Sequence, residues 1–394
     1  MAKEKGNLLR KIAAAAVMLS ILLLFPDHVQ AQTAAPATAA KAAVVMEVYS
    51  NRVLYAKNAD EQLAMASTTK IMTALVVLEN CELQEVVAVA KEAQGVEGSS
   101  IYLSAGERLT VEQLLLGLMM HSGNDAAVAL AIHCGGSVEG FVAMMNAKAQ
   151  EIGATNTRFA NPNGLPAENH YTTAYDLALI AATALQHSDF ARIVNTRTAT
   201  IPWDGKDWDR TLVNKNKLLT LYDGANGVKT GYTKAAGRCL VSSAERDGMW
   251  LVAVVLNSGP MYEDCAKLLD YGFENYGLQQ IIQQGDEFGE LEILNGFESR
   301  LRIQARTDFS YPMRDGERLR MVVRKYTPQV QAPLCQGEVV GHVDIYNEAN
   351  ELIASVPLEA AETVGRNTLA ERLKALVRGL CTNKMGKNGR VDLF

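Results

Sequence analysis

The pattern of hydrophobic and polar positions first predicts a hairpin and a long helix. Residues 42–55 have a strand-like pattern that Ser50-Asn51-Arg52 interrupts, which indicates two strands joined by a tight turn. In residues 68–79, Ala, Leu, Met and Val recur at helical spacing, so a helix is expected there. Ser67 would then lie at the start of that helix.

A block of helices follows, and then strands return. Thr110 and Gln113 have the spacing of a capping box, which predicts a helix that reaches Met120. The next four residues, His121-Ser122-Gly123-Asn124, interrupt the pattern as a loop. Further helices are predicted at residues 126–134, 138–152, 173–186 and 263–276, and β-rich segments at residues 238–244 and 249–256.

The character of the chain changes after Gly277. Short extended segments separated by polar turns predict a small all-β domain. These segments are residues 290–294, 301–305, 318–324, 338–346 and 352–357. Beyond them, an apolar stripe runs from Leu369 to Leu380 at helical spacing, with lysines and arginines around it. A basic amphipathic helix at a chain end can lie in a membrane interface, although it could also dock on its own β domain.

Length, charge and the N-terminus narrow the class of protein. The 394 residues suit two domains, and a net charge of -6 gives no reason to expect a nucleic-acid partner. A basic start, an apolar run at residues 12–25 and the small residues of Val29-Gln30-Ala31 are typical of a signal peptide over residues 1–31. An uncleaved anchor is the alternative. Residues 32–41 are expected to be a flexible lead-in.

The six cysteines point to no redox or metal motif. No Cys-x-x-Cys pair occurs, and no Cys/His cluster suggests zinc. Their wide spacing and apolar neighbours favour buried or isolated thiols, and none has a clear base beside it. We therefore expect no metal, no cofactor and no catalytic cysteine.

Three short motifs carry the candidate chemistry: Ser67-Thr68-Thr69-Lys70, Ser122-Gly123-Asn124 and Lys229-Thr230-Gly231. Three residues along a helix, Lys70 returns to the face of Ser67, where its amine can take the serine proton. Burial and a second cation both lower a lysine pKa, and Lys229 could be that cation. The motifs therefore predict a serine acyl-transfer site with lysine as its base.

The other motif residues have roles that suit acyl transfer. Free N–H groups at the helix start near Ser67 favour a developing oxyanion. Ser122 could relay a proton to the leaving amine, and Asn124 could hold Lys70 or a substrate carbonyl. Lys229 and Thr230 could hold a substrate carboxylate, while Gly231 would let a substrate backbone approach its strand closely. Each motif alone could be structural, as a helix cap, a turn or a strand end.

Together the motifs resemble the penicillin-recognising serine enzymes, and most closely the low-molecular-mass penicillin-binding proteins that act as D-alanyl-D-alanine carboxypeptidases. Residues 118–121, 161–165 and 172–178 also resemble that family. The resemblance implies an α+β penicillin-binding/β-lactamase-like transpeptidase fold, with an antiparallel sheet, helices and an all-helical lobe. The implied domains are a D,D-peptidase domain at residues 42–279, a β-rich domain at 280–362 and a basic amphipathic membrane-associating tail at 363–394.

The resemblance also implies the reaction. Peptidoglycan stem peptides ending in D-Ala-D-Ala would acylate Ser67, with Lys70 as base and Ser122 and Asn124 assisting proton transfer. The backbone N–H groups of Ser67 and Tyr232 would form the oxyanion hole, and β-lactams would acylate the same serine. The protein would be exported, and act as a monomer or weak oligomer at the outer face of a bacterial cytoplasmic membrane.

One departure from the family pattern concerns the substrate carboxylate. Some members carry an arginine after the last central strand, whereas residues 257–264 contain none. Lys215 is the residue that could share the carboxylate role instead.

Three alternatives stay open at this point. A class A β-lactamase usually has Ser-Asp-Asn as its second motif and needs a Glu-x-x-Leu-Asn stretch, but Gly123 replaces the Asp and no such stretch occurs before Lys229. A non-catalytic wall-binding protein would be expected to lose Ser67, Lys70 or Lys229. A β-lactam sensor would need several spanning helices and a cytoplasmic signalling part, whereas one N-terminal apolar run is found. A D,D-endopeptidase that cleaves cross-links has the same motifs, and the sequence does not separate it from a carboxypeptidase.

Overall fold

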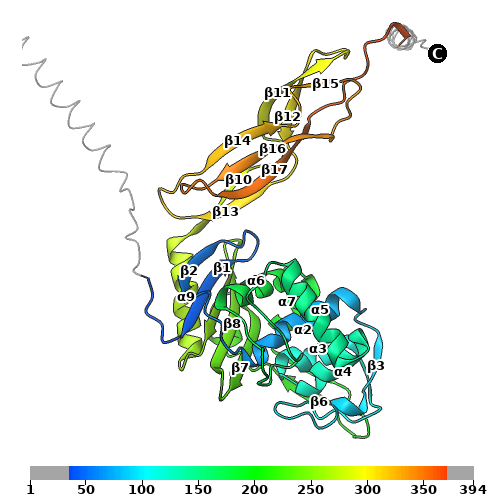
Figure 1. Cartoon of the computed structure of the whole chain (residues 1–394), viewed down its shortest axis with the longest axis vertical. Coiled ribbons are helices and arrows are strands. Elements are labelled where there is room, and N and C mark those ends of the chain that lie inside the picture. Colours follow the sequence, from blue (N-terminus) through cyan, green and yellow to red (C-terminus); the bar gives the residue numbers. More distant parts are fainter. Residues whose placement is uncertain (1–34, 371–394) are drawn as a thin grey trace, which may run out of the picture. The chain divides into compact units, whose positions relative to one another are not determined.

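The computed structural model describes residues 35–370, so the predicted signal peptide and residues 371–394 of the tail lie outside the described part. A five-stranded sheet is at the centre of the first domain, with strand order β2-β1-β9-β8-β7 (Figure 1). The strands are β1 (Ala42–Glu47), β2 (Val53–Lys57), β7 (Ala225–Thr233), β8 (Gly237–Arg246) and β9 (Met249–Leu256). Every neighbouring pair is antiparallel.

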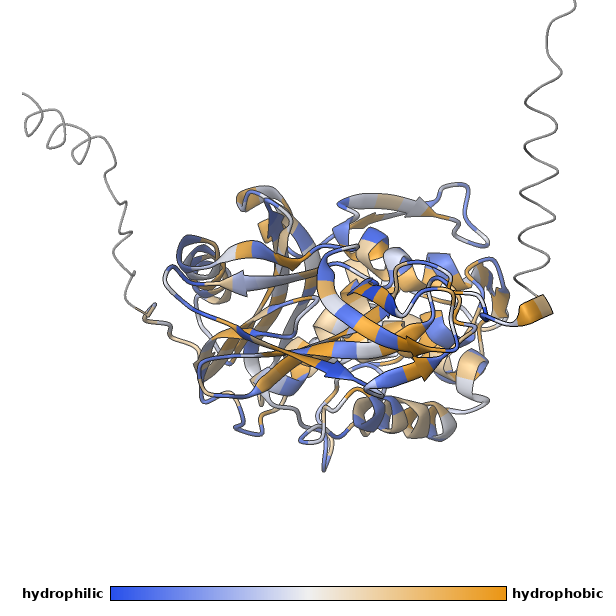
Figure 2. Cartoon of the chain, turned by 90° about the horizontal axis from the view of Figure 1, so that it is seen from above, coloured by the Kyte–Doolittle hydropathy of each residue, from blue (hydrophilic) through white to orange (hydrophobic). Residues whose placement is uncertain are grey.

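Helices cover both faces of this sheet because its central strands are apolar on both sides. Every residue of β1 and β9 is buried. The long helix α9 (Met261–Asn275) packs against β8 and β9 on one face, while α6 (Ala174–Leu185) contacts β1 and β9 on the other. Figure 2 shows hydrophobic residues concentrated in helices and strands, with many hydrophilic residues in the connections.

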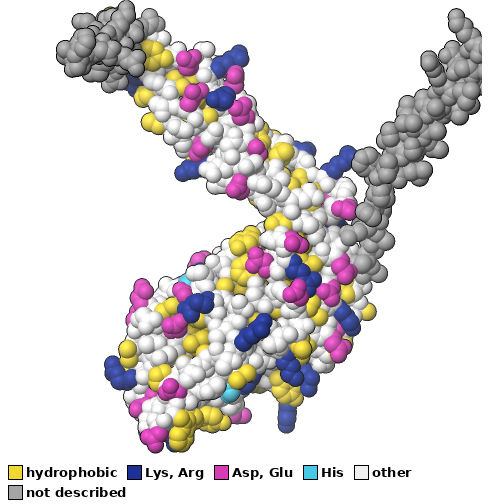
Figure 3. Space-filling model, turned by 180° about the vertical axis from the view of Figure 1, so that it is seen from behind, with side chains coloured by type: hydrophobic (Ala, Val, Ile, Leu, Met, Phe, Trp, Pro, Cys, Tyr) yellow, Lys and Arg dark blue, Asp and Glu magenta, His cyan; other side chains and the backbone are white. Residues whose placement is uncertain are grey.

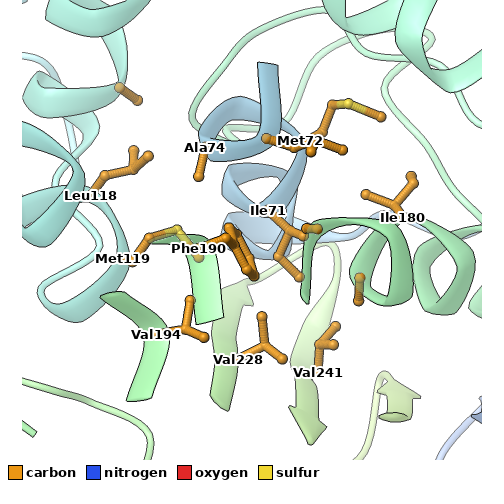
Figure 4. Close-up of a cluster of buried hydrophobic side chains, with 14 of the residues drawn as sticks. Ile71, Met72, Ala74, Leu118, Met119, Ile180, Phe190, Val194, Val228 and Val241 are labelled. Atoms are coloured by element: carbon orange, nitrogen blue, oxygen red, sulfur yellow. The ribbon is translucent and has the colours of Figure 1, made fainter. Parts of the chain in front are cut away.

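The predicted block of helices forms a mainly helical lobe in the rest of this domain. It contains α2 (Lys70–Asn80), α3 (Val111–Met120), α4 (Asn124–Gly135), α5 (Val138–Glu151) and α7 (Ser188–Asn195). The predicted capping box of Thr110 and Gln113 is formed at the start of α3. Helix α2 links the lobe to the sheet, because its Ile71 lies among Phe190, Val228 and Val241 in one buried cluster (Figure 4).

Helix α7 and the following short elements were absent from the sequence-based prediction. These short elements are β3 (Val86–Ala88), β4 (Arg108–Thr110), the hairpin of β5 (Thr198–Ile201) and β6 (Arg210–Val213), α8 (Leu218–Leu221) and the 3-10 turns η1 (Ala66–Thr69) and η2 (Lys91–Ala93). Within residues 35–370, no single helix has the length and apolar character of a membrane span.

The predicted all-β domain is confirmed. A six-stranded sheet has the order β14-β16-β17-β12-β11-β15, and β10 pairs with β13 in a second small sheet. The bounds are β10 (Gly277–Ile282), β11 (Glu287–Leu294), β12 (Arg300–Ala305), β13 (Phe309–Met313), β14 (Arg320–Lys325), β15 (Gln329–Gln331), β16 (Val339–Tyr346) and β17 (Leu352–Ala360). Strand β10 crosses the expected domain boundary between residues 279 and 280.

On the face in Figure 3, acidic and basic side chains are interspersed over the surface of the described residues.

The cysteines differ in their exposure. Cys239 and Cys265 are buried and Cys335 is exposed. The expectation of buried or isolated thiols is wrong for Cys81 and Cys134, because their side chains lie in contact and are partly exposed. Because the two cysteines are far apart in the sequence, the residue pattern gave no sign of this contact.

Candidate active site

Ser67 lies in the tight turn η1, directly before helix α2. The Thr68 hydroxyl donates to the Met65 carbonyl at 2.6 Å, and the Thr69 hydroxyl donates to the Ala66 carbonyl at 2.8 Å. Ala66 has a left-handed backbone with φ of 50°, which is uncommon for a residue with a Cβ. The hydroxyls of the first motif therefore hold Ser67 in a defined turn.

Lys70 connects the first two motifs through its amine. Its side chain is fully buried, and Nζ lies 3.0 Å from Ser67 Oγ and 2.7 Å from Asn124 Oδ1. Nζ also donates to the backbone carbonyl of Asn163. These three acceptors offset part of the cost of burying the amine. The predicted return of Lys70 to the face of Ser67 is confirmed, as is the contact between Asn124 and Lys70.

The surroundings of Lys70 make it a better base than an ordinary lysine. Burial lowers its pKa well below the usual value, and the nearby Lys229 and Lys215 lower it further, while Asp125 opposes them. Burial, and then Lys215, lowers the pKa of Lys229 to about 7. The expected influence of Lys229 on Lys70 is thus present, although burial is the larger cause.

The second motif spans the junction of α3 and α4. Ser122 is buried with φ of 65°, and Asn124 is the first residue of α4. The Asn124 amide nitrogen Nδ2 donates to the Glu97 carbonyl at 2.6 Å, which leaves Oδ1 directed to Lys70. The contact at Nδ2 therefore fixes the orientation of the Asn124 amide, so that its oxygen faces the Lys70 amine.

Sequence reasoning missed three residues that position the site. Asp125 is fully buried, and it accepts the backbone N–H groups of Ile101 and Leu103, which fixes the loop over the start of α4. Asn163 supplies its carbonyl to Lys70. Gly164 has φ of 88°, and a Cβ there would lie 2.0 Å from the Ala66 carbonyl oxygen. Asp125 directly follows the second motif in the sequence, and this position could have identified it as part of the site.

The third motif lies on β7, at an edge of the central sheet. Lys229 is buried, and its Nζ donates to the Thr230 carbonyl at 3.0 Å. A Cβ on Gly231 would lie 3.1 Å from the backbone nitrogen of Ser67, so glycine lets the strand approach the serine. The edge position leaves backbone groups that an extended chain can pair with.

Tyr232 and Lys215 are the remaining predicted site residues. Tyr232 follows Gly231 on β7 and its side chain is 66% exposed. Lys215 Nζ lies 3.4 Å from Ser99 Oγ, and its positive charge lowers the pKa of both Lys70 and Lys229. The segment after β9, residues 257–264, contains no arginine. Arg238 of the neighbouring strand β8 extends to this segment, where its guanidinium lies 3.5 Å from the Gly259 carbonyl.

Comparison with known proteins gives two family matches. Residues 29–259 match the model described as D-alanyl-D-alanine carboxypeptidase, and residues 276–366 match the C-terminal domain of penicillin-binding protein 5. The chain is 35% identical to the D-alanyl-D-alanine carboxypeptidase DacF of Bacillus subtilis, over 82% of this chain and 85% of DacF. It is 32% identical to the D-alanyl-D-alanine carboxypeptidase DacC of Escherichia coli, over 92% of this chain and 93% of DacC.

Solved structures agree with this similarity in both domains. Penicillin-binding protein 5 of Haemophilus influenzae is 30% identical with a TM-score of 0.71, over 85% of this chain and all of that one. A peptidoglycan synthesis regulatory factor, PBP3 of Streptococcus pneumoniae, is 27% identical with a TM-score of 0.74, over 84% of this chain and all of that one. The predicted α+β penicillin-binding fold with its small all-β domain is therefore confirmed, while the predicted amphipathic helix of the tail lies largely outside the described residues.

We expect Gly164→Ala to displace the turn that carries Ser67. Alanine at Gly164 combines an unfavourable φ with a clash against the Ala66 carbonyl. Gly106→Ala is the matched control, because Gly106 has φ of 83° and open space around its Cβ position. Urea unfolding should show Gly164→Ala to be roughly 1–3 kcal/mol less stable than the control.

Covalent labelling of Ser67 by a fluorescent penicillin should also slow in Gly164→Ala and stay unchanged in Gly106→Ala. Equal stability and equal labelling rates in the two variants would contradict the positioning role of Gly164.

Proposed function

The chain belongs to the D-alanyl-D-alanine carboxypeptidase family of serine peptidases, and from this premise we propose how its own residues act. Ser67 attacks the peptide bond between the two D-alanines of a peptidoglycan stem peptide. Terminal D-alanine leaves, and water then hydrolyses the acyl-enzyme. The observation that carries this proposal is the buried Lys70 amine, 3.0 Å from Ser67 Oγ.

In the acylation step, neutral Lys70 takes the proton of Ser67 as Oγ bonds to the carbonyl carbon. The carbonyl oxygen becomes an oxyanion, which the backbone N–H groups of Ser67 and Tyr232 stabilise. The carbon–nitrogen bond then breaks, and the proton passes through Ser122 to the leaving amine. Asn124 keeps the Lys70 amine in position through the 2.7 Å contact at Oδ1.

Substrate binding uses the third motif. The stem peptide pairs with the edge of β7, where Gly231 leaves room beside Ser67. Lys229 and Thr230 bind its terminal carboxylate, and Lys215 adds positive charge. A β-lactam with a carboxylate occupies the same place and acylates Ser67. A carboxypeptidase needs such a carboxylate site, since its substrate ends there, and this favours terminal trimming over cleavage of cross-links.

We expect Ser67→Ala to abolish both covalent labelling by a fluorescent penicillin and release of D-alanine from a peptide ending in D-Ala-D-Ala. Mass spectrometry of the peptide measures the second effect. Thr220→Ala, at an exposed position of α8, serves as the control and should keep both activities. Labelling that persists in Ser67→Ala would contradict the nucleophile, and cleavage of cross-linked dimers without D-alanine release would favour an endopeptidase.

The two lysines predict a pH profile for acylation by a carboxylate-bearing β-lactam. The rate should rise with pH while Lys70 loses its proton, because the neutral amine is the base. It should fall above about pH 7, because Lys229, with a pKa of about 7, then loses the charge that holds the carboxylate. Rapid-mixing measurements of acylation over a pH series would give both limbs.

Lys229→Gln removes the neighbouring cation, so the pKa of Lys70 should rise and the acidic limb should move to higher pH. The rate itself should fall roughly 100-fold through loss of carboxylate binding. Lys267→Gln, on the exposed side of α9, is the control. An acidic limb that stays in place in Lys229→Gln would show that the two lysines are not coupled.

We further propose that the protein is exported and held at the outer face of the membrane by its tail. The basic start and apolar run of residues 1–31 and the amphipathic pattern of residues 363–394 support this proposal. A stem peptide in the growing wall is outside the membrane, so an enzyme that trims it has to act there.

Truncation before Arg366 should release the protein from membranes while D-alanine release from a soluble peptide is retained. Sedimentation with membrane vesicles, compared between the full chain and the truncated chain, measures the effect. If the truncated chain still sediments with the vesicles, the tail is not the anchor.

A further inference from the structure

A cluster of potential metal ligands lies at the far ends of the two helices that begin at the active site. Helix α2 begins at Lys70 and is followed by Cys81, while α4 begins at Asn124 and contains His133 and Cys134 in its last turn. At a rise of 1.5 Å per residue, this places the cluster about 16 Å along the helices from the catalytic lysine.

Three side chains in this cluster have their ligand atoms close enough for one ion. The Cys81 thiol, a Glu85 carboxylate oxygen and a His133 ring nitrogen all lie within 4.8 Å of one another. His133 Nε2 is 3.0 Å from Glu85 Oε2. The other carboxylate oxygen, Oε1, accepts the backbone N–H of Glu82 at 2.8 Å, which holds the Glu85 side chain in place.

A fourth donor lies beside them. The Cys134 thiol lies beside that of Cys81, although it is not among the three side chains whose ligand atoms all lie within 4.8 Å of one another. Cys81 and Glu85 also line a surface pocket with Glu79 and His187, which gives an ion a path from solvent. The sequence showed no zinc pattern because Cys81 and Glu85 follow one helix while His133 and Cys134 end another.

We propose that Cys81, Glu85, His133 and Cys134 bind a divalent ion of the zinc class. Sulfur, imidazole nitrogen and carboxylate oxygen together suit Zn²⁺, whereas Mg²⁺ and Ca²⁺ prefer oxygen ligands. Zinc bonds of about 2.0–2.3 Å hold tetrahedral ligand atoms roughly 3–4 Å apart, so small side-chain movements complete the site. On binding, the two thiols release their protons to solvent and the thiolates form bonds to the ion.

Such an ion would join the segment after α2 to the last turn of α4. The opposite ends of these helices meet through the Lys70–Asn124 contact at 2.7 Å, so each helix would be fixed at both ends. The ion would therefore have a stabilising role, with no part in the acylation chemistry. The proposal stands on these side chains alone and is independent of the proposed function.

The test uses the full chain after treatment with a chelator and a reductant. Zn²⁺ should bind with one-to-one stoichiometry in competition with a chromophoric chelator and should raise the melting temperature. Co²⁺ in its place should give thiolate-to-cobalt charge-transfer absorption and the visible bands of tetrahedral cobalt. Cys81→Ser and His133→Gln should each weaken Zn²⁺ binding at least about tenfold and lose the stabilisation.

Cys335→Ser and His187→Gln are the matched controls, since Cys335 is an exposed thiol of the β domain and His187 lines the pocket outside the cluster. Both should bind Zn²⁺ as the parent chain does. Folding of each variant is checked by covalent labelling with a fluorescent penicillin, which needs an intact Ser67 turn.

Three results would overturn the proposal. They are no stoichiometric Zn²⁺ binding by the reduced parent chain, unchanged binding in Cys81→Ser or His133→Gln, and a Cys81–Cys134 disulfide in chain isolated without reductant. Peptide mass mapping detects the disulfide.

Discussion

The active site depends on one buried amine. Lys70 Nζ is shared among Ser67 Oγ, Asn124 Oδ1 and the Asn163 carbonyl, which come from a turn, a helix start and a loop. An amine removed from water is costly unless its surroundings supply acceptors, and here each acceptor belongs to a different segment. The same removal from water that makes Lys70 expensive to bury also favours its neutral form, which is the form that catalysis needs.

The remainder of the domain can be understood as the support for that contact. The turn η1 is fixed by the Thr68 and Thr69 hydroxyls and by the close approach of Gly164. Asp125 fixes the loop over α4, and glycine at position 231 brings the edge strand to the serine. The catalytic geometry therefore depends on residues other than the nucleophile and its base.

The sequence predicted the parts of this arrangement that have a local signal. Apolar periodicity identified α2 and α9, and the capping box of α3 was predicted from Thr110 and Gln113. Elements of three or four residues, such as β3 and β5, were missed because so short a segment has no periodicity to detect, and the eight-residue helix α7 was missed as well. The carbonyl of Asn163 and the contact between Cys81 and Cys134 could not be predicted, since each depends on tertiary structure that brings distant segments together.

The pairing of β1 with β9 has a consequence for how the enzyme comes into being. Ala42 is in register with Leu256, so the first strand of the domain acquires its central partner only when nearly the whole domain exists. Contacts between such distant segments are slow to form. Until they form, the apolar faces of β1, which are buried in the finished domain, stay exposed. A partial chain that lacks β7 and β9 therefore exposes an apolar strand, and its Ser67 turn has no β7 to pack against. The geometry of the active site therefore requires the chain to extend through β9.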